Sequence, residues 1–314
     1  IPKAALEVLP MVGREFGEAA LAHPALAGVV FTGSTATGRW LNRALAAREG
    51  AILPLIAETG GINAMIVDST ALPEQVVDDA VHSAFGSAGQ RCSALRLLCL
   101  QDEVADRILE MLEGAMDTLV VGDPADLATD VGPVITAAAA DGLRAHIGAM
   151  QHAGARLRRQ TALPAATDLD HLAREARIEP GRFVPPTLLE VQDARALDRE
   201  AFGPVLHVLR WRTRDLPSLL EALRANGYGL TLGVQTRLDG TRDTVYSGTA
   251  AGNVYVNRNM IGAVVGVQPF GGSGLSGTGP KAGGPHYLAR FTTERTLTVN
   301  TTATGGNTAL LSLG

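Results

Sequence analysis

The 314-residue sequence predicts an α/β fold, because short apolar runs typical of buried strands alternate with segments of helical periodicity. The clearest example is the β-branched run at 27–32, which is typical of a parallel sheet and is followed by a glycine turn and a helical segment at 39–47. Hydrophobic residues make up 46% and charged residues 19% of the chain, so a sizeable core is available and disorder is not expected. The length is that of one large domain or two.

The other expected elements follow along the chain. Helical spacing and capping signals predict helices at 15–22, 73–83, 103–119, 137–153 and 216–225. Apolar or β-branched runs predict strands at 53–56, 64–67, 96–101, 205–209, 229–235, 252–257 and 292–300. The stretch 183–188 is predicted to be an extended edge segment, since its prolines cannot donate to a strand ladder. Residues 162–181 are interpreted as a surface excursion.

The charge pattern argues against several classes of function. A net charge of −5 without a basic stripe disfavours a general nucleic-acid surface. The one basic cluster, at 156–159, is interpreted as a solvated helix end. No apolar run is long enough to span a membrane, and the N-terminal residues lack the apolar core of a signal peptide. Because the chain starts with Ile1-Pro2 and without Met, we expect an excerpt of a longer polypeptide.

A candidate nucleophile lies in the loop GSAGQRCSA at 86–94, where small residues around Cys92 would let a substrate carbon approach its sulfur. Arg91 would favour the reactive thiolate if its head group faced that sulfur. The alternative is that Cys92 is a small buried hydrophobic residue, as many free cysteines are. The second cysteine, Cys99, lies in an apolar run and is expected to be structural. The two cysteines and seven histidines match no metal-binding spacing, so we expect no metal and a reduced, cytoplasmic protein.

Glu58 is the candidate partner of this cysteine. It follows an apolar run and begins the element ETGG at 58–61; considered alone, it is better explained as the solvent-facing end of a helix or strand. Together, however, ETGG and the GQRC element at 89–92 resemble the aldehyde dehydrogenase superfamily, where such a glutamate precedes such a cysteine. The resemblance implies that Cys92 attacks an aldehyde and that Glu58 acts as the general base.

The turn GSTATG at 33–38 joins a strand to a helix and could present backbone N–H groups to a phosphate, although a plain turn is the alternative. The resemblance implies that NAD is the cofactor and that this turn contacts its pyrophosphate. It also implies that Glu200, in the element EAFGP, binds the nicotinamide ribose hydroxyls and that Phe202 packs beside the nicotinamide. The expected cofactor-binding residues are therefore Gly33, Ser34, Gly38, Glu58, Thr59, Gly60, Glu200 and Phe202.

Finer features narrow the resemblance to the glutamate-semialdehyde (1-pyrroline-5-carboxylate) dehydrogenases, and most closely to that domain of the bifunctional proline utilisation A flavoenzymes. These features are Ser93 after the cysteine and the segments VQPFGG at 267–272, SGTGPKAGGP at 276–285 and TATGGNTALLSLG at 302–314. The implied substrate is L-glutamate γ-semialdehyde. A hydroxyl and paired N–H donors would suit its α-carboxylate, and the expected substrate-binding residues are Arg91, Ser93, Gly262, Ala263 and Phe270.

The resemblance covers nearly the whole chain and implies an aldehyde dehydrogenase fold in three parts. We expect part of a Rossmann-like NAD-binding domain at 1–66, an α/β catalytic domain at 67–288, and an oligomerisation strand with a tail at 289–314. The implied partners are further copies of the chain, in a homodimer or larger homo-oligomer. In a bifunctional parent, a proline dehydrogenase domain would hold FAD on the same polypeptide.

Other functions remain open at this stage. The resemblance places an oxyanion-binding asparagine, a lysine for the adenosine ribose and the residue that separates NAD from NADP upstream of Ile1. A catalytically incomplete fragment, or a structural or oligomerisation module that keeps the fold, is therefore the main alternative. A thiol hydrolase without nicotinamide is a further alternative, which the lack of a histidine partner for Cys92 disfavours.

Overall fold

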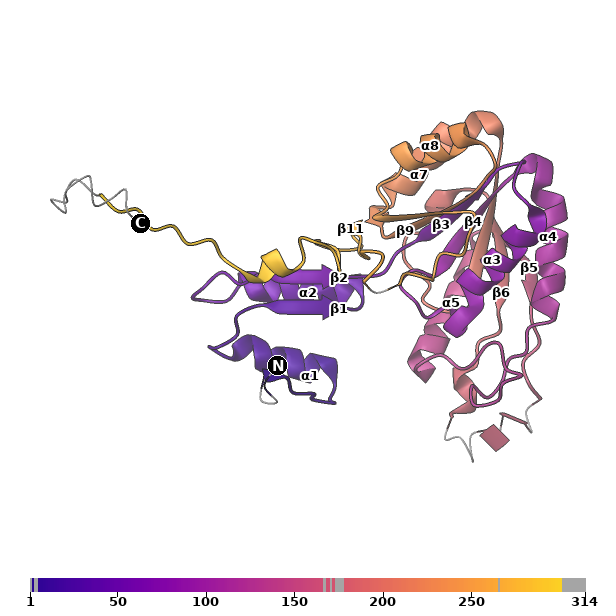
Figure 1. Cartoon of the computed structure of the whole chain (residues 1–314). Coiled ribbons are helices and arrows are strands. Elements are labelled where there is room, and N and C mark those ends of the chain that lie inside the picture. The colour runs from indigo at the N-terminus through magenta and orange to yellow at the C-terminus, as the bar shows by residue number, and fades with distance from the viewer. Residues whose placement is uncertain are drawn as a thin grey trace.

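The computed structural model describes residues 2, 5–165, 168–169, 171–172, 178–264 and 266–300, and it confirms the expected α/β architecture. A small lobe and a large lobe lie next to each other (Figure 1). The small lobe contains a two-stranded sheet, and the large lobe contains a seven-stranded sheet with the strand order β10-β9-β3-β4-β7-β6-β5.

Six strands of the large sheet run parallel, and the edge strand β5 (Arg156–Gln160) pairs antiparallel to its neighbour. The parallel strands are β3 (Asn63–Val67), β4 (Leu95–Gln101), β6 (Thr187–Val191), β7 (Val205–Trp211), β9 (Thr231–Gln235) and β10 (Asn253–Val256). Every residue of β3, β4, β6 and β9 is buried, which explains why these strands are mostly apolar runs and not alternating patterns.

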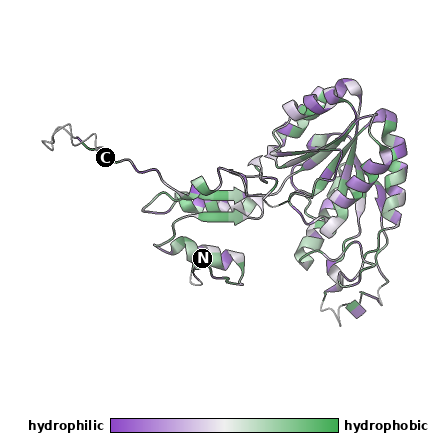
Figure 2. Cartoon of the chain, in the orientation of Figure 1, coloured by the Kyte–Doolittle hydropathy of each residue, from purple (hydrophilic) through white to green (hydrophobic). Residues whose placement is uncertain are grey.

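Helices cover both faces of the large sheet (Figure 1). The chain moves from β3 to β4 in one direction along the sheet and from β7 through β9 to β10 in the other. Right-handed crossovers therefore place the helices of the two halves on opposite faces. The first pair is α3 (Pro73–Phe85) and α4 (Asp102–Asp117), and the second is α7 (Leu216–Ala225) and α8 (Asp239–Gly248); α5 (Ala137–His152) precedes β5. Figure 2 shows largely apolar strands between helices of mixed polarity.

The small lobe is built on β1 (Val29–Thr32) and β2 (Leu55–Glu58), which pair in parallel. Helix α2 (Thr35–Ala46) follows β1 and packs against α1 (Gly13–Ala22). A segment from the far end of the chain returns to this lobe, because the N–H of Thr278 donates to the carbonyl of Ala57 at 2.9 Å. The two lobes are thus connected before β3 and again after β10.

Several expectations about elements were wrong. Residues 156–159 form the strand β5 and not a helix end, because their arginines pair with acids on α4 and on β6. The stretch 183–188 leads into β6, which lies inside the sheet and not at its edge. Residues 292–300 are exposed and form no strand within this single chain, so the oligomerisation strand expected there stays a prediction. Residues 302–314 lie outside the described residues.

The boundary expected between 66 and 67 falls inside β3, which belongs wholly to the large sheet. The division between the two sheets therefore lies before Asn63. Within the described residues, no helix is both long and apolar enough to cross a membrane, and no group of three or more His, Cys, Asp or Glu side chains could hold a metal ion.

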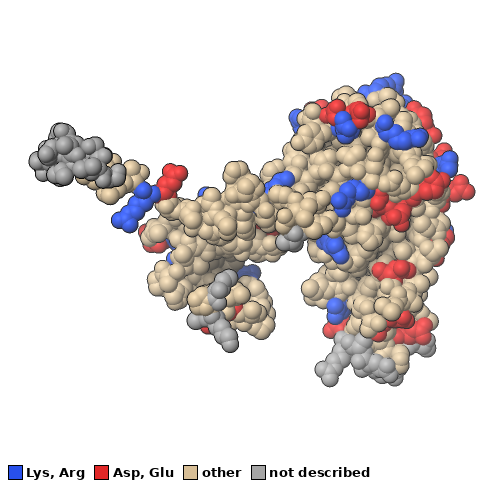
Figure 3. Space-filling view, viewed as in Figure 1, with Lys and Arg blue, Asp and Glu red and all other residues tan. Residues whose placement is uncertain are grey.

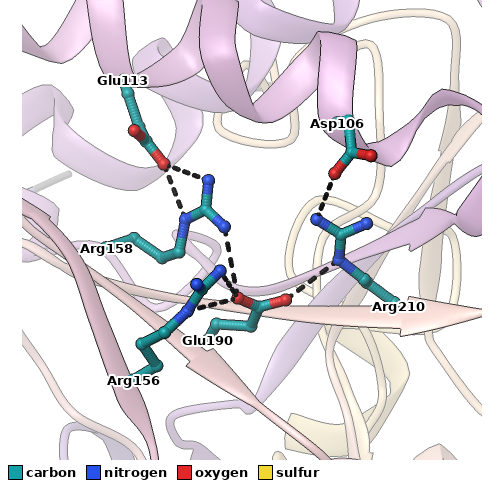
Figure 4. A network of polar contacts seen from close by, with 6 residues as sticks. All are labelled: Asp106, Glu113, Arg156, Arg158, Glu190 and Arg210. Atoms are coloured by element: carbon teal, nitrogen blue, oxygen red, sulfur yellow. Dashed lines mark hydrogen bonds and ion pairs between the residues drawn. The ribbon is translucent and has the colours of Figure 1, made fainter.

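An ion-pair network fixes the β5 edge to the sheet (Figure 4). Glu190 on β6 is 6% exposed and accepts hydrogen bonds from Arg156 at 3.0 Å, Arg158 at 3.3 Å and Arg210 at 3.0 Å. The outer ends of the network are Glu113 and Asp106 on α4, at 2.6 Å from Arg158 and Arg210 respectively. Figure 3 shows charged side chains of both signs on the surface of the large lobe.

Replacing Glu190 by Ala should lower the free energy of unfolding by about 3 kcal/mol, because it leaves arginines near the sheet without their shared acid. Urea unfolding followed by circular dichroism measures the change. Asp106→Ala is the matched control, since that carboxylate is exposed and surface pairs contribute little. Equal midpoints for the two variants would contradict the central role of Glu190.

Candidate active site

A cavity of about 970 Å³ lies between the two lobes. The carboxyl ends of β1 and β2 open into it from the small lobe, as expected for ligand sites on parallel sheets. The large sheet contributes the opposite ends, since the loops that precede β4, β7 and β9 line the same cavity. The lining includes Gly33, Ser34, Glu58, Thr59, Gly60, Arg91, Cys92, Ser93, Glu200, Phe202, Ala263 and Phe270.

The loop that carries Cys92 has a constrained backbone. Ser87 and Ala88 adopt positive φ values of 57° and 54°, which are uncommon for residues other than glycine. Gly89 follows with φ of 65°, and a Cβ there would lie 2.2 Å from the carbonyl oxygen of Gly203. Asn63 holds the far side of the loop, because its Nδ2 donates to the carbonyls of Cys92 at 2.7 Å and of Ala94 at 2.9 Å.

The surroundings of Cys92 favour the neutral thiol over the thiolate. Burial raises its pKa, and the carboxylates of Glu200 and Glu58 raise it further, while the backbone N–H groups of Ser93 and Cys92 act in the opposite direction. Arg91 would favour the thiolate only if its head group faced the sulfur, and it is not among the groups that shift the pKa of Cys92. Its guanidinium donates to Ser87 Oγ at 3.0 Å and to the Ile261 carbonyl at 3.4 Å, so it fixes the loop conformation.

Glu58, the last residue of β2, is held by glycines of the returning segment. Its Oε2 accepts from the N–H of Gly272 at 3.1 Å, and Oε1 is buried without a hydrogen-bond partner in the described part of the chain. Burial raises the pKa of this carboxyl to about 7, although the Gly272 N–H and the charge of Lys281 oppose the shift. A carboxyl with this pKa can gain or lose a proton near neutral pH, as a general base requires.

Glu200 reaches the same cavity from the turn before β7. Its carboxylate lies over the glycines that follow Glu58, since a Cβ on Gly60 would come 1.7 Å from Glu200 Oε2. Burial raises the pKa of Glu200, and the opposing groups are the Arg96 guanidinium and the N–H of Gly61. Phe202, two residues later, is 44% exposed and lines the cavity, so its ring is open to a ligand.

Arg96 is a residue of this site that sequence reasoning missed. It is 1% exposed, and its guanidinium donates to Glu200 Oε1 at 3.0 Å, to the Gly203 carbonyl at 3.1 Å and to the Arg91 carbonyl at 3.2 Å. It also lies over the Phe202 ring, 5.4 Å from the centroid. The one available signal was a charged residue inside the apolar run LRLLCLQ.

The turn at the start of α2 offers an anion site. Ser34 caps the helix by accepting from the N–H of Thr37 at 3.2 Å, and the first turn contains no acidic residue. The free N–H groups of a helix N-terminus favour phosphate. Gly38 does not line the cavity; a Cβ there would lie 3.1 Å from Thr59 Cγ2, so this glycine allows α2 to pack against the small lobe. Together with Glu200 and the open Phe202 ring, these donors fit a dinucleotide.

The expected substrate-binding residues also line this cavity, with one exception. Ser93, Ala263, Phe270 and Arg91 line the cavity beside Cys92. Gly262 is not among the lining residues, and its carbonyl accepts from Arg258 Nη2 at 3.1 Å. Cys99, by contrast, is fully buried in β4, as expected of a structural cysteine.

Comparison with known proteins places these features in a family. The sequence model of the aldehyde dehydrogenase family matches residues 1–297. The bifunctional protein PutA of Escherichia coli is 52% identical over 94% of this chain and 22% of its own length. The 1-pyrroline-5-carboxylate dehydrogenase of Bacillus subtilis is 34% identical over 92% of this chain and 54% of its own length. The chain thus spans less than a quarter of the first relative and about half of the second.

Comparison with solved structures finds relatives of the same two kinds. A crystal structure of a bifunctional proline utilization A protein superposes with a TM-score of 0.87 at 57% identity, and covers 97% of this chain and 30% of the solved chain. A 1-pyrroline-5-carboxylate dehydrogenase from Thermus with bound NAD gives a TM-score of 0.78 at 34% identity, and covers 90% of this chain and 52% of the solved chain.

Alkylation of Cys92 by iodoacetamide should be slow at pH 7 and still rise above pH 9, because burial and the neighbouring carboxylates raise the thiol pKa. Glu200→Gln should speed alkylation at pH 7.5, since removing a negative charge stabilises the thiolate. Mass spectrometry of the Cys92 peptide measures the rate. Glu190→Gln, which changes a glutamate outside the cavity, should match the wild-type protein; a Glu200→Gln profile equal to wild type would refute this assignment.

Proposed function

Because the chain belongs to the aldehyde dehydrogenase family, we propose that its polypeptide oxidises L-glutamate γ-semialdehyde to L-glutamate with NAD. The observation that carries the proposal is the convergence of Cys92, Glu58 and Glu200 on one cavity from three separate segments. This convergence weighs against a purely structural module, which would not need a nucleophile beside a buried carboxyl of raised pKa.

NAD would lie along the cavity from the start of α2 to Cys92. The N-terminal turn of α2 would hold the pyrophosphate, and the Glu200 carboxylate would accept hydrogen bonds from ribose hydroxyls. Phe202 would pack against the nicotinamide with its open ring face. NAD, when bound, supplies the hydride acceptor of the reaction.

The first task of the protein residues is nucleophilic attack. Cys92 must first lose its proton to solvent, because the thiolate is the reactive form of the side chain. The thiolate then attacks the aldehyde carbon and forms a thiohemiacetal. The backbone N–H of Cys92 is a donor for the oxygen of this intermediate.

The second task is hydrolysis. After oxidation, the acyl group is held on Cys92 as a thioester, and a water molecule must be deprotonated to attack it. Glu58 lines the same cavity and can take that proton, because its pKa of about 7 leaves the carboxyl partly ionised at neutral pH.

Recognition of the substrate would depend on its α-carboxylate. The Ser93 hydroxyl directly follows the nucleophile, and Ala263 and Phe270 line the cavity beside it. A hydroxyl and backbone N–H donors bind a carboxylate through charge-assisted hydrogen bonds, which are the stronger class. Arg91 adds positive charge at the same wall of the cavity.

We also propose that the parent polypeptide is bifunctional, with a proline dehydrogenase domain that holds FAD. The support is the identity of 53% to the bifunctional protein PutA of Klebsiella aerogenes against 34% to a separate 1-pyrroline-5-carboxylate dehydrogenase. Assembly as a homo-oligomer is part of the same proposal. So is a cytoplasmic location, because the reaction needs the free Cys92 thiol, which a reducing compartment preserves.

Glu58→Gln in the full-length protein should give one fast burst of NADH followed by turnover reduced about 100-fold, because thioester hydrolysis loses its base. The wild-type rate should rise with pH through about 7 as the Glu58 carboxyl ionises, and the variant should lose that rise. Stopped-flow absorbance measures both. Cys92→Ser is the control and should show neither burst nor turnover; wild-type turnover in this control would end the assignment.

Ser93→Ala should raise the KM for glutamate γ-semialdehyde about tenfold with a smaller change in kcat, because one donor to the α-carboxylate is lost. The KM for an aldehyde of similar length without a carboxylate should change little. Steady-state kinetics on the two substrates measures the difference. An equal rise for both substrates would place Ser93 in the nucleophile loop's structure and not in carboxylate recognition.

A further inference from the structure

We propose that Arg96 is a positioning residue, which holds the Glu200 carboxylate in place for cofactor binding and fixes both Glu200 and Phe202 to the nucleophile loop. The inference rests on the proposed function, because it assigns to Glu200 and Phe202 the binding of NAD. Arg96 hydrogen-bonds to the segments on both sides of the site and also interacts electrostatically with Cys92.

The contacts of Arg96 join two parts of the site that are distant in sequence. On one side, its Nη2 donates to the carbonyl of Arg91, the residue before the nucleophile, at 3.2 Å. On the other, Nη2 donates to Glu200 at 3.0 Å, and Nη1 donates to the Gly203 carbonyl at 3.1 Å. The guanidinium plane also supports the ring of Phe202. One planar cation therefore joins the nucleophile loop to three residues of the EAFGP turn.

The backbone of Arg96 is itself fixed from below. His207 on β7 donates from Nδ1 to the Arg96 carbonyl at 2.9 Å, and its Nε2 lies 2.9 Å from Nε2 of His146 on α5. Burial lowers the pKa of His207 to about 3, so the ring stays neutral and keeps one nitrogen as donor and the other as acceptor. Arg96 thus extends from a rigid support in the large sheet.

The charge of Arg96 matters because Glu200 is largely buried. The groups around that carboxylate are Arg96 from β4, the Gly61 N–H after β2, and Cys92. Glu58 and Arg199 line the same cavity. Burial raises the pKa of Glu200, and Arg96 is the first of the opposing influences. Without this cation, the carboxyl would hold its proton at higher pH and would accept hydroxyl hydrogen bonds less well.

The test measures NAD binding to the full-length protein by calorimetry without aldehyde, between pH 6.5 and 8.5. Wild-type affinity is the reference at each pH, because Glu58 in the same cavity, with its pKa of about 7, titrates in all of these proteins. Arg96→Met should bind NAD about tenfold more weakly at pH 6.5, and the deficit should shrink as rising pH ionises Glu200. Arg96→Lys should weaken binding without the new pH dependence, because lysine keeps the charge but cannot reach three acceptors.

Two further variants test whether ionisation of Glu200 causes the weaker binding of Arg96→Met. In Arg96→Met with Glu200→Gln, the pH dependence that Arg96→Met adds to that of wild type should vanish, since the group responsible for it is gone. Arg210→Lys is the matched control, because Arg210 also pairs with a partly buried glutamate but lies in the network outside the cavity; it should bind NAD within twofold of wild type. Loss of packing alone would weaken binding equally at every pH.

Wild-type affinity in folded Arg96→Met, or a deficit that does not vary with pH, would overturn the inference. If Arg96→Met does not fold, Arg96→Lys decides through its affinity, and wild-type binding there overturns the inference. If the wild-type protein binds NAD but does not oxidise glutamate γ-semialdehyde, the proposed substrate is wrong. The role of Arg96 is then decided by the NAD-binding measurements alone. Wild-type protein that binds no NAD would overturn both.

Discussion

The site depends on close packing that glycine alone permits. Three turns meet between the lobes, and at each meeting point a side chain or backbone occupies the space where a Cβ would lie. Gly89 packs against the Gly203 carbonyl, and Gly60 packs against the Glu200 carboxylate. A Cβ on Gly271 would lie 2.7 Å from Glu58 Oε1. Larger residues would separate the nucleophile loop from the general base and from Glu200. The density of glycine in these motifs is therefore a condition of the geometry and not only a sign of turns.

The ionisation of the site follows from the same arrangement. Glu58 belongs to the small lobe through β2, yet the donor to its carboxylate, Gly272, lies on the segment that returns from the large lobe. Its raised pKa comes mainly from burial, which exists because the two lobes close over it. The pKa of Cys92 is raised as well, again mainly by burial. Both reacting groups are thus largely protonated at rest below pH 7, and the cavity avoids holding several uncompensated negative charges.

Local sequence patterns predicted most of the helices and the parallel strands, because buried strands need apolar runs and helices need periodic ones. The motifs around Glu58, Cys92 and Glu200 also predicted which residues would meet. What failed depended on contacts between distant segments. The arginines of β5 look like a solvated helix end until Glu190 and Asp117 are known to lie beside them. The orientation of Arg91 depends on Ser87 and on Ile261, and no local pattern specifies the second contact.

Arg96 is a buried arginine that local sequence patterns do not identify as part of the site. Its role goes beyond stabilising the fold. A fully buried guanidinium loses its hydration, and here Nε remains without a hydrogen-bond partner in the described part of the chain. Burial lowers the pKa of Arg96, which reflects this unfavourable environment. An apolar residue in a buried strand would often be at least as stabilising as a buried ion pair. The presence of arginine is better explained by what its planar head group does for Glu200, Phe202 and the nucleophile loop at once, which no apolar side chain can do.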